Sequence, residues 1–99
     1  MEVYFGDKQT ARLYEGGSPG KADPPPEVVD AMREVIELML KATSTQDLRN
    51  QSSLRYEHLK ADRKGWVSVR VNRQYRLIFE EAKGQPAALV NVRLSKHYE

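Results

Sequence analysis

The hydrophobic residues change their spacing part-way along the chain, and this change limits the folds that the sequence can adopt. Over residues 27–42 the apolar positions, from Val28 to Leu40, recur every three or four residues with charged residues between them. That spacing places an apolar stripe along one side of a helix. From Val67 onward, apolar and polar residues alternate instead, which puts them on opposite faces of a strand. We therefore predict an amphipathic helix followed by a sheet.

Three segments of the C-terminal half carry the alternation of strands, and a fourth strand is expected around residues 55–59. Residues 72–74 are predicted to form a tight turn between the first two segments. The alternating apolar positions are Val67, Val69 and Val71, then Tyr75, Leu77 and Phe79, then Val90, Val92 and Leu94. Short consecutive strands that follow two helices predict an α+β fold, with the helices packed on one face of an antiparallel sheet.

The N-terminal part of the chain contains signals for a short strand and a short helix. Residues 1–5 are predicted to form a strand, and Asp7 is placed to cap a helix that ends before the glycines at 16–17. Three consecutive prolines at 24–26 cannot lie inside a helix, but the last of them suits a first helical turn. The amphipathic helix is therefore expected to begin near Pro25.

Length and composition place the chain among small folded proteins. Its 99 residues are close to the usual size of one domain, so a single domain over residues 1–99 is expected. The sequence contains no cysteine, which removes disulfides and thiolate chemistry and fits a reducing compartment. No apolar stretch approaches the roughly 20 residues of a membrane span. We expect a cytoplasmic protein without a membrane partner.

Positive charge is concentrated in one part of the sequence. Residues 54–79 contain seven Lys or Arg against two acidic residues, whereas residues 1–47 contain five against nine. Because this basic segment coincides with predicted strands, the charge would lie on a rigid surface that attracts polyanions. On charge alone, a nucleic-acid partner and a merely solvated basic face are equally open.

The residue types of a metal-free ribonuclease are present at the ends of these strands. Arg70 and Arg76 are predicted to share the sheet face opposite the helices, and Lys60 can add charge to the same surface, which suits phosphate binding. His97 and Tyr98 end the last strand, and such groups can transfer the protons of 2′-hydroxyl attack and 5′-oxygen departure. Spacing alone leaves open that these are solvated residues without a role.

Other chemistries are disfavoured. His58 and His97 are the two histidines, and without cysteine they give no metal-ligand spacing, so neither a metal nor a cofactor is expected. The sequence has no Gly-rich phosphate loop, no nucleophile-elbow pattern and no helix-turn-helix signal. Trp66 is expected to serve packing rather than the stacking of RNA bases.

Five segments of the chain match, in order and at matching intervals, those of one known family. They are FGDKQTARLYEGG, PPEVVDAMREVIELMLKA, TSTQDLRN, LRYEHLKADRKGWVSVRVNRQYRLIF and VNVRLSKHY. Their most specific parts are LKADRKG, the pair SVRVN and QYRLIF, and the terminal His and Tyr. Over nearly its whole length the sequence resembles the HigB-type toxins, the plasmid maintenance killer proteins of the RelE superfamily.

The resemblance implies both an activity and a set of partners. It implies a RelE-like toxin of a type II toxin–antitoxin system, which acts as a metal-independent, ribosome-dependent endoribonuclease on mRNA and so inhibits translation. The implied partners are the ribosome, mRNA and a HigA-type antitoxin with a helix-turn-helix, through which alone operator DNA is contacted. A ParE-like gyrase inhibitor and a catalytically weak, antitoxin-binding relative are the alternatives.

Carried onto this sequence, the resemblance indicates site residues. The catalytic set comprises Lys60, Arg70 and Arg76 together with His97 and Tyr98. The family usually ends in Asp-Tyr-His, whereas here the imidazole and the phenol are exchanged and a lysine replaces the acid. Because adjacent strand positions face opposite sides, the sequence does not decide which of the two aromatic groups transfers the proton. The predicted RNA-binding set is Lys60, Arg63, Lys64, Arg70, Arg73, Arg76 and Lys96.

Overall fold

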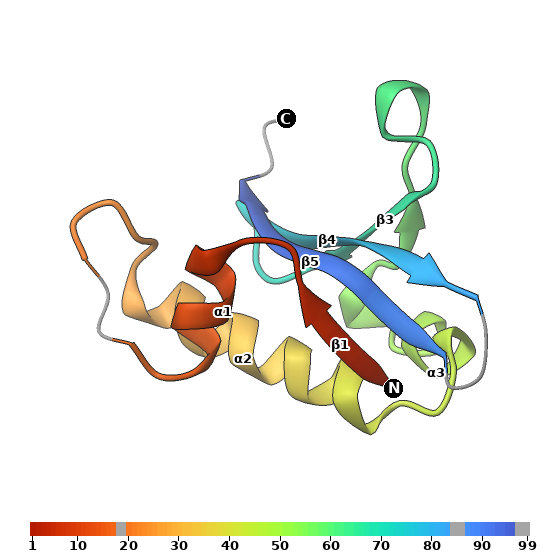
Figure 1. Ribbon diagram of the computed structural model, residues 1–99, viewed down its shortest axis with the longest axis horizontal. Coiled ribbons are helices and arrows are strands. Elements are labelled where there is room, and N and C mark those ends of the chain that lie inside the picture. The colour runs from red at the N-terminus through yellow and green to blue at the C-terminus, as the bar shows by residue number, and fades with distance from the viewer. Residues whose placement is uncertain (18–19, 84–86, 97–99) are drawn as a thin grey trace.

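The structure is a computed structural model and describes residues 1–17, 20–83 and 87–96. Five strands form one sheet in the order β1-β5-β4-β3-β2, with α1 and α2 on one side of it (Figure 1). Along the chain the elements, with η for a short 3-10 helix, are β1 (Glu2–Phe5), α1 (Lys8–Tyr14), α2 (Pro26–Lys41), α3 (Thr45–Arg49), η1 (Ser52–Leu54), β2 (Glu57–His58), η2 (Ala61–Arg63), β3 (Trp66–Arg70), β4 (Tyr75–Ala82) and β5 (Ala88–Lys96).

The α+β class and the packing of helices on one sheet face are confirmed, and one edge of the sheet differs from the prediction. Strands β2 to β5 are antiparallel neighbours, but β1 pairs with β5 in parallel. No tight hairpin joins β1 to β5, so tertiary packing rather than a turn sets their relative direction. The sheet is therefore mixed instead of wholly antiparallel.

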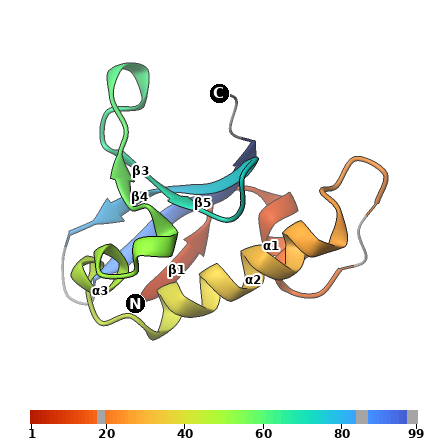
Figure 2. The same cartoon turned by 180° about the vertical axis from the view of Figure 1, so that it is seen from behind.

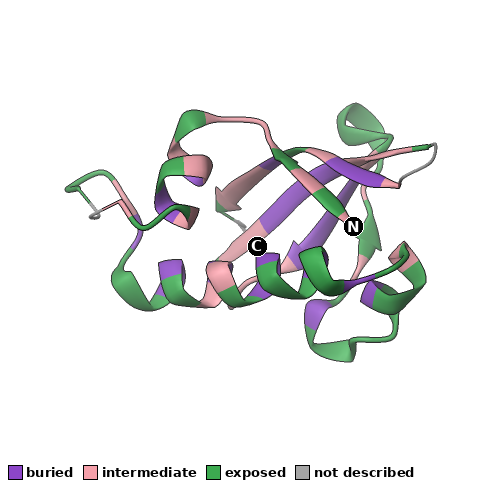
Figure 3. Cartoon of the chain, turned by 60° about the horizontal axis from the view of Figure 1, so that its bottom comes forward, coloured by how far each residue is buried: buried purple, intermediate pink, exposed green. Residues whose placement is uncertain are grey.

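Helix α2 covers the sheet with the stripe that its sequence spacing predicted. Seen from behind, α2 runs along the sheet, with α1 and α3 near its opposite ends (Figure 2). The sheet-facing side of α2 and the middle of the sheet are buried, whereas the outer side of α2 is exposed (Figure 3). Leu40, which the spacing assigned to the stripe, is 39% exposed instead. The buried residues of α2 are Val28, Val29, Met32, Val35, Ile36 and Met39.

Both predicted helix starts are confirmed. The Asp7 carboxylate accepts a hydrogen bond from the Thr10 backbone N–H at 2.8 Å, which caps α1. Such a side chain satisfies one of the N–H groups that a first helical turn leaves unpaired. Helix α2 begins at Pro26 directly after Pro25, where a missing N–H costs nothing.

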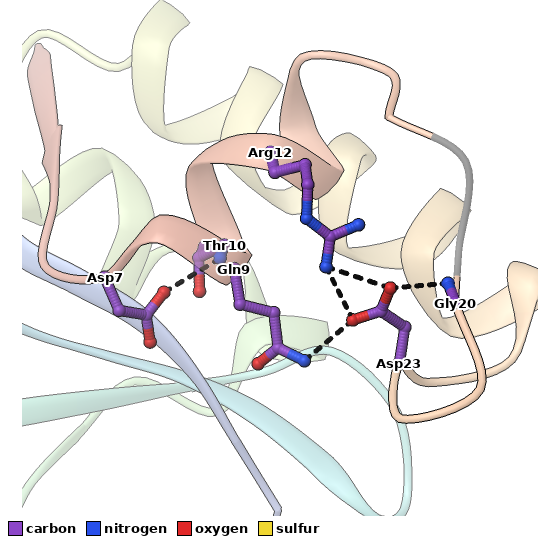
Figure 4. A network of polar contacts seen from close by, with 6 residues as sticks. All are labelled: Asp7, Gln9, Thr10, Arg12, Gly20 and Asp23. Atoms are coloured by element: carbon purple, nitrogen blue, oxygen red, sulfur yellow. Dashed lines mark hydrogen bonds and ion pairs between the residues drawn. The ribbon is translucent and has the colours of Figure 1, made fainter.

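A network around Asp23 ties the loop that precedes α2 to α1 (Figure 4). The Asp23 carboxylate, 4% exposed, accepts hydrogen bonds from the Arg12 guanidinium at 2.8 Å and the Gln9 amide at 2.9 Å. It also accepts one from the Gly20 backbone N–H at 2.7 Å. The hydrogen bond from Arg12, followed by those from Gly20 and Gln9, holds the pKa of Asp23 well below its usual range.

Helix α1 also fixes the end of β5. Strand β1 stops after Phe5 pairs with Val92, and the Gly6 N–H donates to the Val92 carbonyl at 2.8 Å. Beyond that point the backbone N–H of Leu94 donates to the hydroxyl of Thr10, which is completely buried, at 3.0 Å. A side chain of α1 thus replaces the edge strand as the hydrogen-bond acceptor, as a buried N–H requires.

A bulge in β5 overturns part of the predicted alternation. Asn91 has a φ of 55°, and the β4–β5 register shifts where it lies, with Ile78 opposite Arg93 but Glu80 opposite Val90. A bulge changes the sheet face to which the residues before it point. Val90 therefore does not face the core, contrary to the prediction from its alternation with Val92 and Leu94. Asparagine tolerates this left-handed backbone better than most residues do.

Candidate nucleic-acid interface

Three outer-facing positions on adjacent strands bring polar and cationic side chains to the sheet face opposite α2. Arg70 of β3 pairs directly with Arg76 of β4, and Arg76 pairs in turn with Ser95 of β5. Directly opposed residues of antiparallel strands point to the same face. The predicted placement of Arg70 and Arg76 on one face is therefore confirmed.

A hollow of about 350 Å³ opens on this face beside Arg76. Its walls come from the segment between β2 and β3, which stands away from α2 in Figure 1, and from the end of β5. Ile78, 6% exposed, and the buried Ser68 lie among its lining residues. The charged residues that line it are Glu57, Lys60, Arg63, Arg76 and Lys96.

Four of the seven residues predicted to bind RNA line the hollow, and the other three do not. Arg70 donates a hydrogen bond from Nε to the backbone carbonyl of Asn72 at 3.3 Å. Its side chain is therefore held at the end of β3 and does not line the hollow. Lys64 and Arg73 are exposed, and neither lines the hollow. The predicted proton-transfer residues His97 and Tyr98 lie outside the described residues.

The segment that carries Lys60 and Arg63 is held in a sharply folded backbone. Ala61 has a φ of 58° and Gly65 a φ of 93°, both in the left-handed region. The Leu59 N–H donates to the Trp66 carbonyl at 2.9 Å and closes this loop. A left-handed alanine costs about 1–2 kcal/mol, and such strain is common at functional sites because it fixes side chains in advance.

Three arginines of this face lack acidic partners among the described residues. No ion pair joins Arg63, Arg70 or Arg76 to another described side chain. The Arg76 guanidinium contacts only the neutral Ser68 hydroxyl, at 3.4 Å. Because like charges directly opposite each other destabilise a sheet, the Arg70–Arg76 pair favours a bound anion. The geometry therefore suits a phosphate group.

Some residues of the face were not singled out by the sequence. Ser68 and Ser95 lie on it because they occupy the same alternating positions as Arg70 and Arg76, and that signal was available in the sequence. Glu57 brings a carboxylate into the cationic hollow, and its two-residue strand is too short for a clear alternation. Arg93, which the sequence did not single out, lies over the Trp66 ring at 5.4 Å from its centre.

The described part of the chain contains no cluster of metal-ligating side chains and no helix that could span a membrane. Over residues 1–17, 20–83 and 87–96, no three His, Cys, Asp or Glu side chains gather as metal ligands would. None of the helices found there is long and apolar enough to span a bilayer.

Comparison with known proteins identifies the family. The family described as the RelE-like toxin of the type II toxin–antitoxin system HigB matches residues 3–97. The chain belongs to the HigB-like toxins. Toxin HigB-1 of Vibrio cholerae serotype O1 is 37% identical over 84 residues, which are 85% of this chain and 87% of that protein. The sequence resemblance is thereby confirmed, and membership in this family implies an antitoxin partner.

A solved structure shows that the fold is shared more widely. The YoeB/ParE toxin from Agrobacterium tumefaciens matches with a TM-score of 0.59 and covers 99% of this chain and 100% of its own. Its sequence identity is 18%, so the likeness concerns the fold alone. The HigB-like toxin thus has the small α+β fold of that toxin, and the roles of its individual residues remain predictions.

Proposed function

We propose that this HigB-like toxin is a ribosome-dependent endoribonuclease that cuts mRNA without a metal ion or cofactor. The observation that carries the proposal is the hollow, which is lined by Lys60, Arg63, Arg76 and Lys96 together with one carboxylate, that of Glu57. Membership in the HigB-like family supports the proposal. Cleavage of an RNA phosphodiester requires cations that bind the phosphate and a group that accepts a proton, and this basic, concave face offers both.

The cations are proposed to bind and activate the scissile phosphate. The planar Arg76 guanidinium can donate two parallel hydrogen bonds to phosphate oxygens, and Lys60 adds a point charge from the opposite wall. When the 2′-oxygen attacks phosphorus, negative charge grows on the non-bridging oxygens. Donors already aimed at that charge stabilise the transition state more than the bound substrate.

The reaction also needs a proton acceptor and a proton donor. The 2′-hydroxyl loses its proton as its oxygen bonds to phosphorus, and the bond to the 5′-oxygen breaks as that oxygen gains a proton. Among the described residues of the hollow, Glu57 is the one carboxylate, and we assign it the acceptor role. His97 and Tyr98 are the proposed donors. The products are a 2′,3′-cyclic phosphate and a 5′-hydroxyl.

Ribosome dependence fits the shape of the site. The hollow is an open depression of about 350 Å³ on a sheet face, and it does not enclose an RNA strand. Attack in line with the departing oxygen requires a fixed backbone geometry, and an RNA strand free in solution rarely holds it. A ribosome that orders the mRNA would supply this orientation, which contributes much of the rate of a positioned reaction.

The proposal is tested by expression of the toxin without its antitoxin, followed by mapping of 5′ ends in translated messages. We expect growth arrest with codon-associated cleavage. Arg76→Ala should lower cleavage by about 10²–10³-fold, the usual loss for one transition-state donor. His97→Ala should also reduce it. The matched control is Lys21→Ala, which removes an exposed positive charge from the loop before α2.

Two outcomes would contradict the proposal. Intact mRNA during growth arrest would exclude cleavage as the cause of toxicity. DNA damage together with intact mRNA would favour gyrase inhibition, the function of the ParE-like alternative. Loss of toxicity in Lys21→Ala and Arg76→Ala to the same extent would show that general charge, and not the hollow, is responsible.

We further propose that the antitoxin is of the HigA type and contains a helix-turn-helix. The toxin itself shows no such motif, so contact with operator DNA is expected through the antitoxin alone. Co-expression should yield a complex that shifts operator DNA in a gel, whereas the isolated toxin should not. A shift by the toxin alone would refute this division of roles.

A further inference from the structure

A second hollow lies on the same face and continues from the cationic one. Its volume is about 320 Å³, and it shares Arg63, Ile78 and Ser95 with the first hollow. Depressions of this size fall within the usual range of small-ligand sites. The residues that line only the second hollow are Asp62, Trp66, Arg93 and Leu94.

The second hollow combines charged side chains with a planar aromatic ring and aliphatic surface. The Arg93 guanidinium lies over the Trp66 ring, 5.4 Å from its centre, in a cation–π contact. Ile78 provides apolar surface between them and the phosphate-binding hollow. Trp66 pairs with Glu80 on the outer face of the sheet and does not belong to the hydrophobic core. Its large ring is therefore not explained by packing against the helices.

We propose that the second hollow binds a nucleobase next to the phosphate held by Arg76, with Trp66 and Arg93 as its stacking surface. The proposal rests on the proposed function, since it assumes that the bound polyanion is RNA. Single-stranded RNA is recognised by bases stacked on aromatic rings or on arginine planes. This proposed role differs from the expectation that Trp66 serves packing rather than the stacking of RNA bases.

Asp62 gives the second hollow a preference among bases. Its exposed carboxylate lines the hollow and, when ionised, only accepts hydrogen bonds. Adenine, cytosine and guanine present an amino group on the pairing edge, whereas uracil has none, and its single N3–H lies between two carbonyl oxygens that a carboxylate repels. Asp62 is therefore assigned as a specificity residue that disfavours uracil.

Trp66 is the only tryptophan of the chain, so its fluorescence reports on this hollow directly. The toxin is titrated with a short single-stranded oligoribonucleotide and with an abasic oligomer that has the same sugar–phosphate backbone. We expect quenching by the first and little quenching by the second. Equal quenching by both oligomers would overturn the proposal, because a phosphate site alone explains it.

Variants separate stacking from charge. Trp66→Leu should weaken binding of the base-containing oligomer, measured by fluorescence anisotropy of a labelled RNA, by about 5- to 150-fold. Trp66→Phe, which keeps an aromatic ring, should restore part of the affinity. Asp62→Asn should reduce the preference for oligo(A) over oligo(U). Unchanged affinity in Trp66→Leu would overturn the stacking surface, and an unchanged preference in Asp62→Asn would overturn the role of Asp62.

The binding experiment does not depend on cleavage. Base-dependent quenching without mRNA cleavage would leave the nucleobase site standing and remove the proposed nuclease. Cleavage by the wild-type toxin without base-dependent quenching, and unimpaired in Trp66→Leu, would keep the nuclease and remove the nucleobase site. The two failures are therefore distinguishable.

Discussion

The hydrogen bond between Thr10 and β5 gives the sharpest test of how the fold supports the site. Thr10→Val keeps the size of the side chain but removes the hydroxyl that accepts from the Leu94 N–H at 3.0 Å. Position 10 is completely buried, so water cannot replace the lost acceptor. A buried N–H left without a partner costs about 1–3 kcal/mol. We expect the free energy of unfolding to fall by that amount.

Urea denaturation measures the effect. With an m value of about 1–3 kcal/mol/M, a loss of this size moves the midpoint down by roughly 1 M. Thr10→Ser is the matched control, because it keeps the acceptor and removes one methyl group, at about 0.8 kcal/mol. Hydrogen exchange should localise the change, with the Leu94 amide exchanging faster in Thr10→Val than in Thr10→Ser.

The reasoning would be refuted if Thr10→Val were as stable as Thr10→Ser, or if exchange at the Leu94 amide were unchanged. The substitution should also affect function, because of where Leu94 lies in β5. Leu94 directly precedes Ser95 and Lys96, which line the cationic hollow. If Thr10→Val is folded but loosens this end of β5, cleavage should fall more than the Thr10→Ser control predicts.

Three further predictions concern pH, catalysis and the β5 bulge. Since hydrogen bonds lower the pKa of Asp23, its contribution to stability is present above its unfolded pKa of about 3.9 and fades as pH falls below that value. Asp23→Asn should therefore be less stable than wild type in urea at pH 6, with the gap narrowing steadily as pH falls below about 4 toward the depressed pKa of the folded state; a constant gap would contradict this. Glu57→Gln should lower single-turnover cleavage by about 10²–10⁴-fold while RNA affinity in a filter-binding assay is kept; a full rate would exclude Glu57 as the base. Asn91→Val should lower the free energy of unfolding by about 1–2 kcal/mol in a thermal scan, because a β-branched residue strains the left-handed backbone, and Asn91→Gly should cost less; equal losses would contradict the role of the backbone.

Elements set by local signals were predictable from the sequence. The cap at Asp7, the helix start after Pro25 and the turn at residues 72–74 all follow from contacts within a few positions, and the structure has each of them. In that turn the Asn72 side chain accepts from the Tyr75 N–H at 2.8 Å. Family motifs extended the prediction to the whole fold, because they add information that no local window contains.

Features set by tertiary packing were not predictable. The parallel pairing of β1 joins segments more than eighty residues apart, and no local signal gives its direction. The bulge at Asn91 shifts the faces of β5 although the sequence alternates without interruption. Alternation correctly placed Arg70 and Arg76 on one face, but it could not show that Arg70 turns toward Asn72. The strand register determines the sheet face on which a residue lies, but only the contacts around a long side chain determine the direction in which it points.

The arrangement of the charges shows why the site depends on its scaffold. Cations gathered on one face repel one another, so Arg76 and Arg70 stay adjacent only because the β3–β4 ladder, packed on a buried core, holds them there. The same rigidity lets the donors meet a phosphate without reorganisation, which is the source of electrostatic catalysis. A flexible loop with the same charges would spread them apart. In the proposed phosphate site, the sheet that fixes these cations therefore matters more than the net charge of the basic segment.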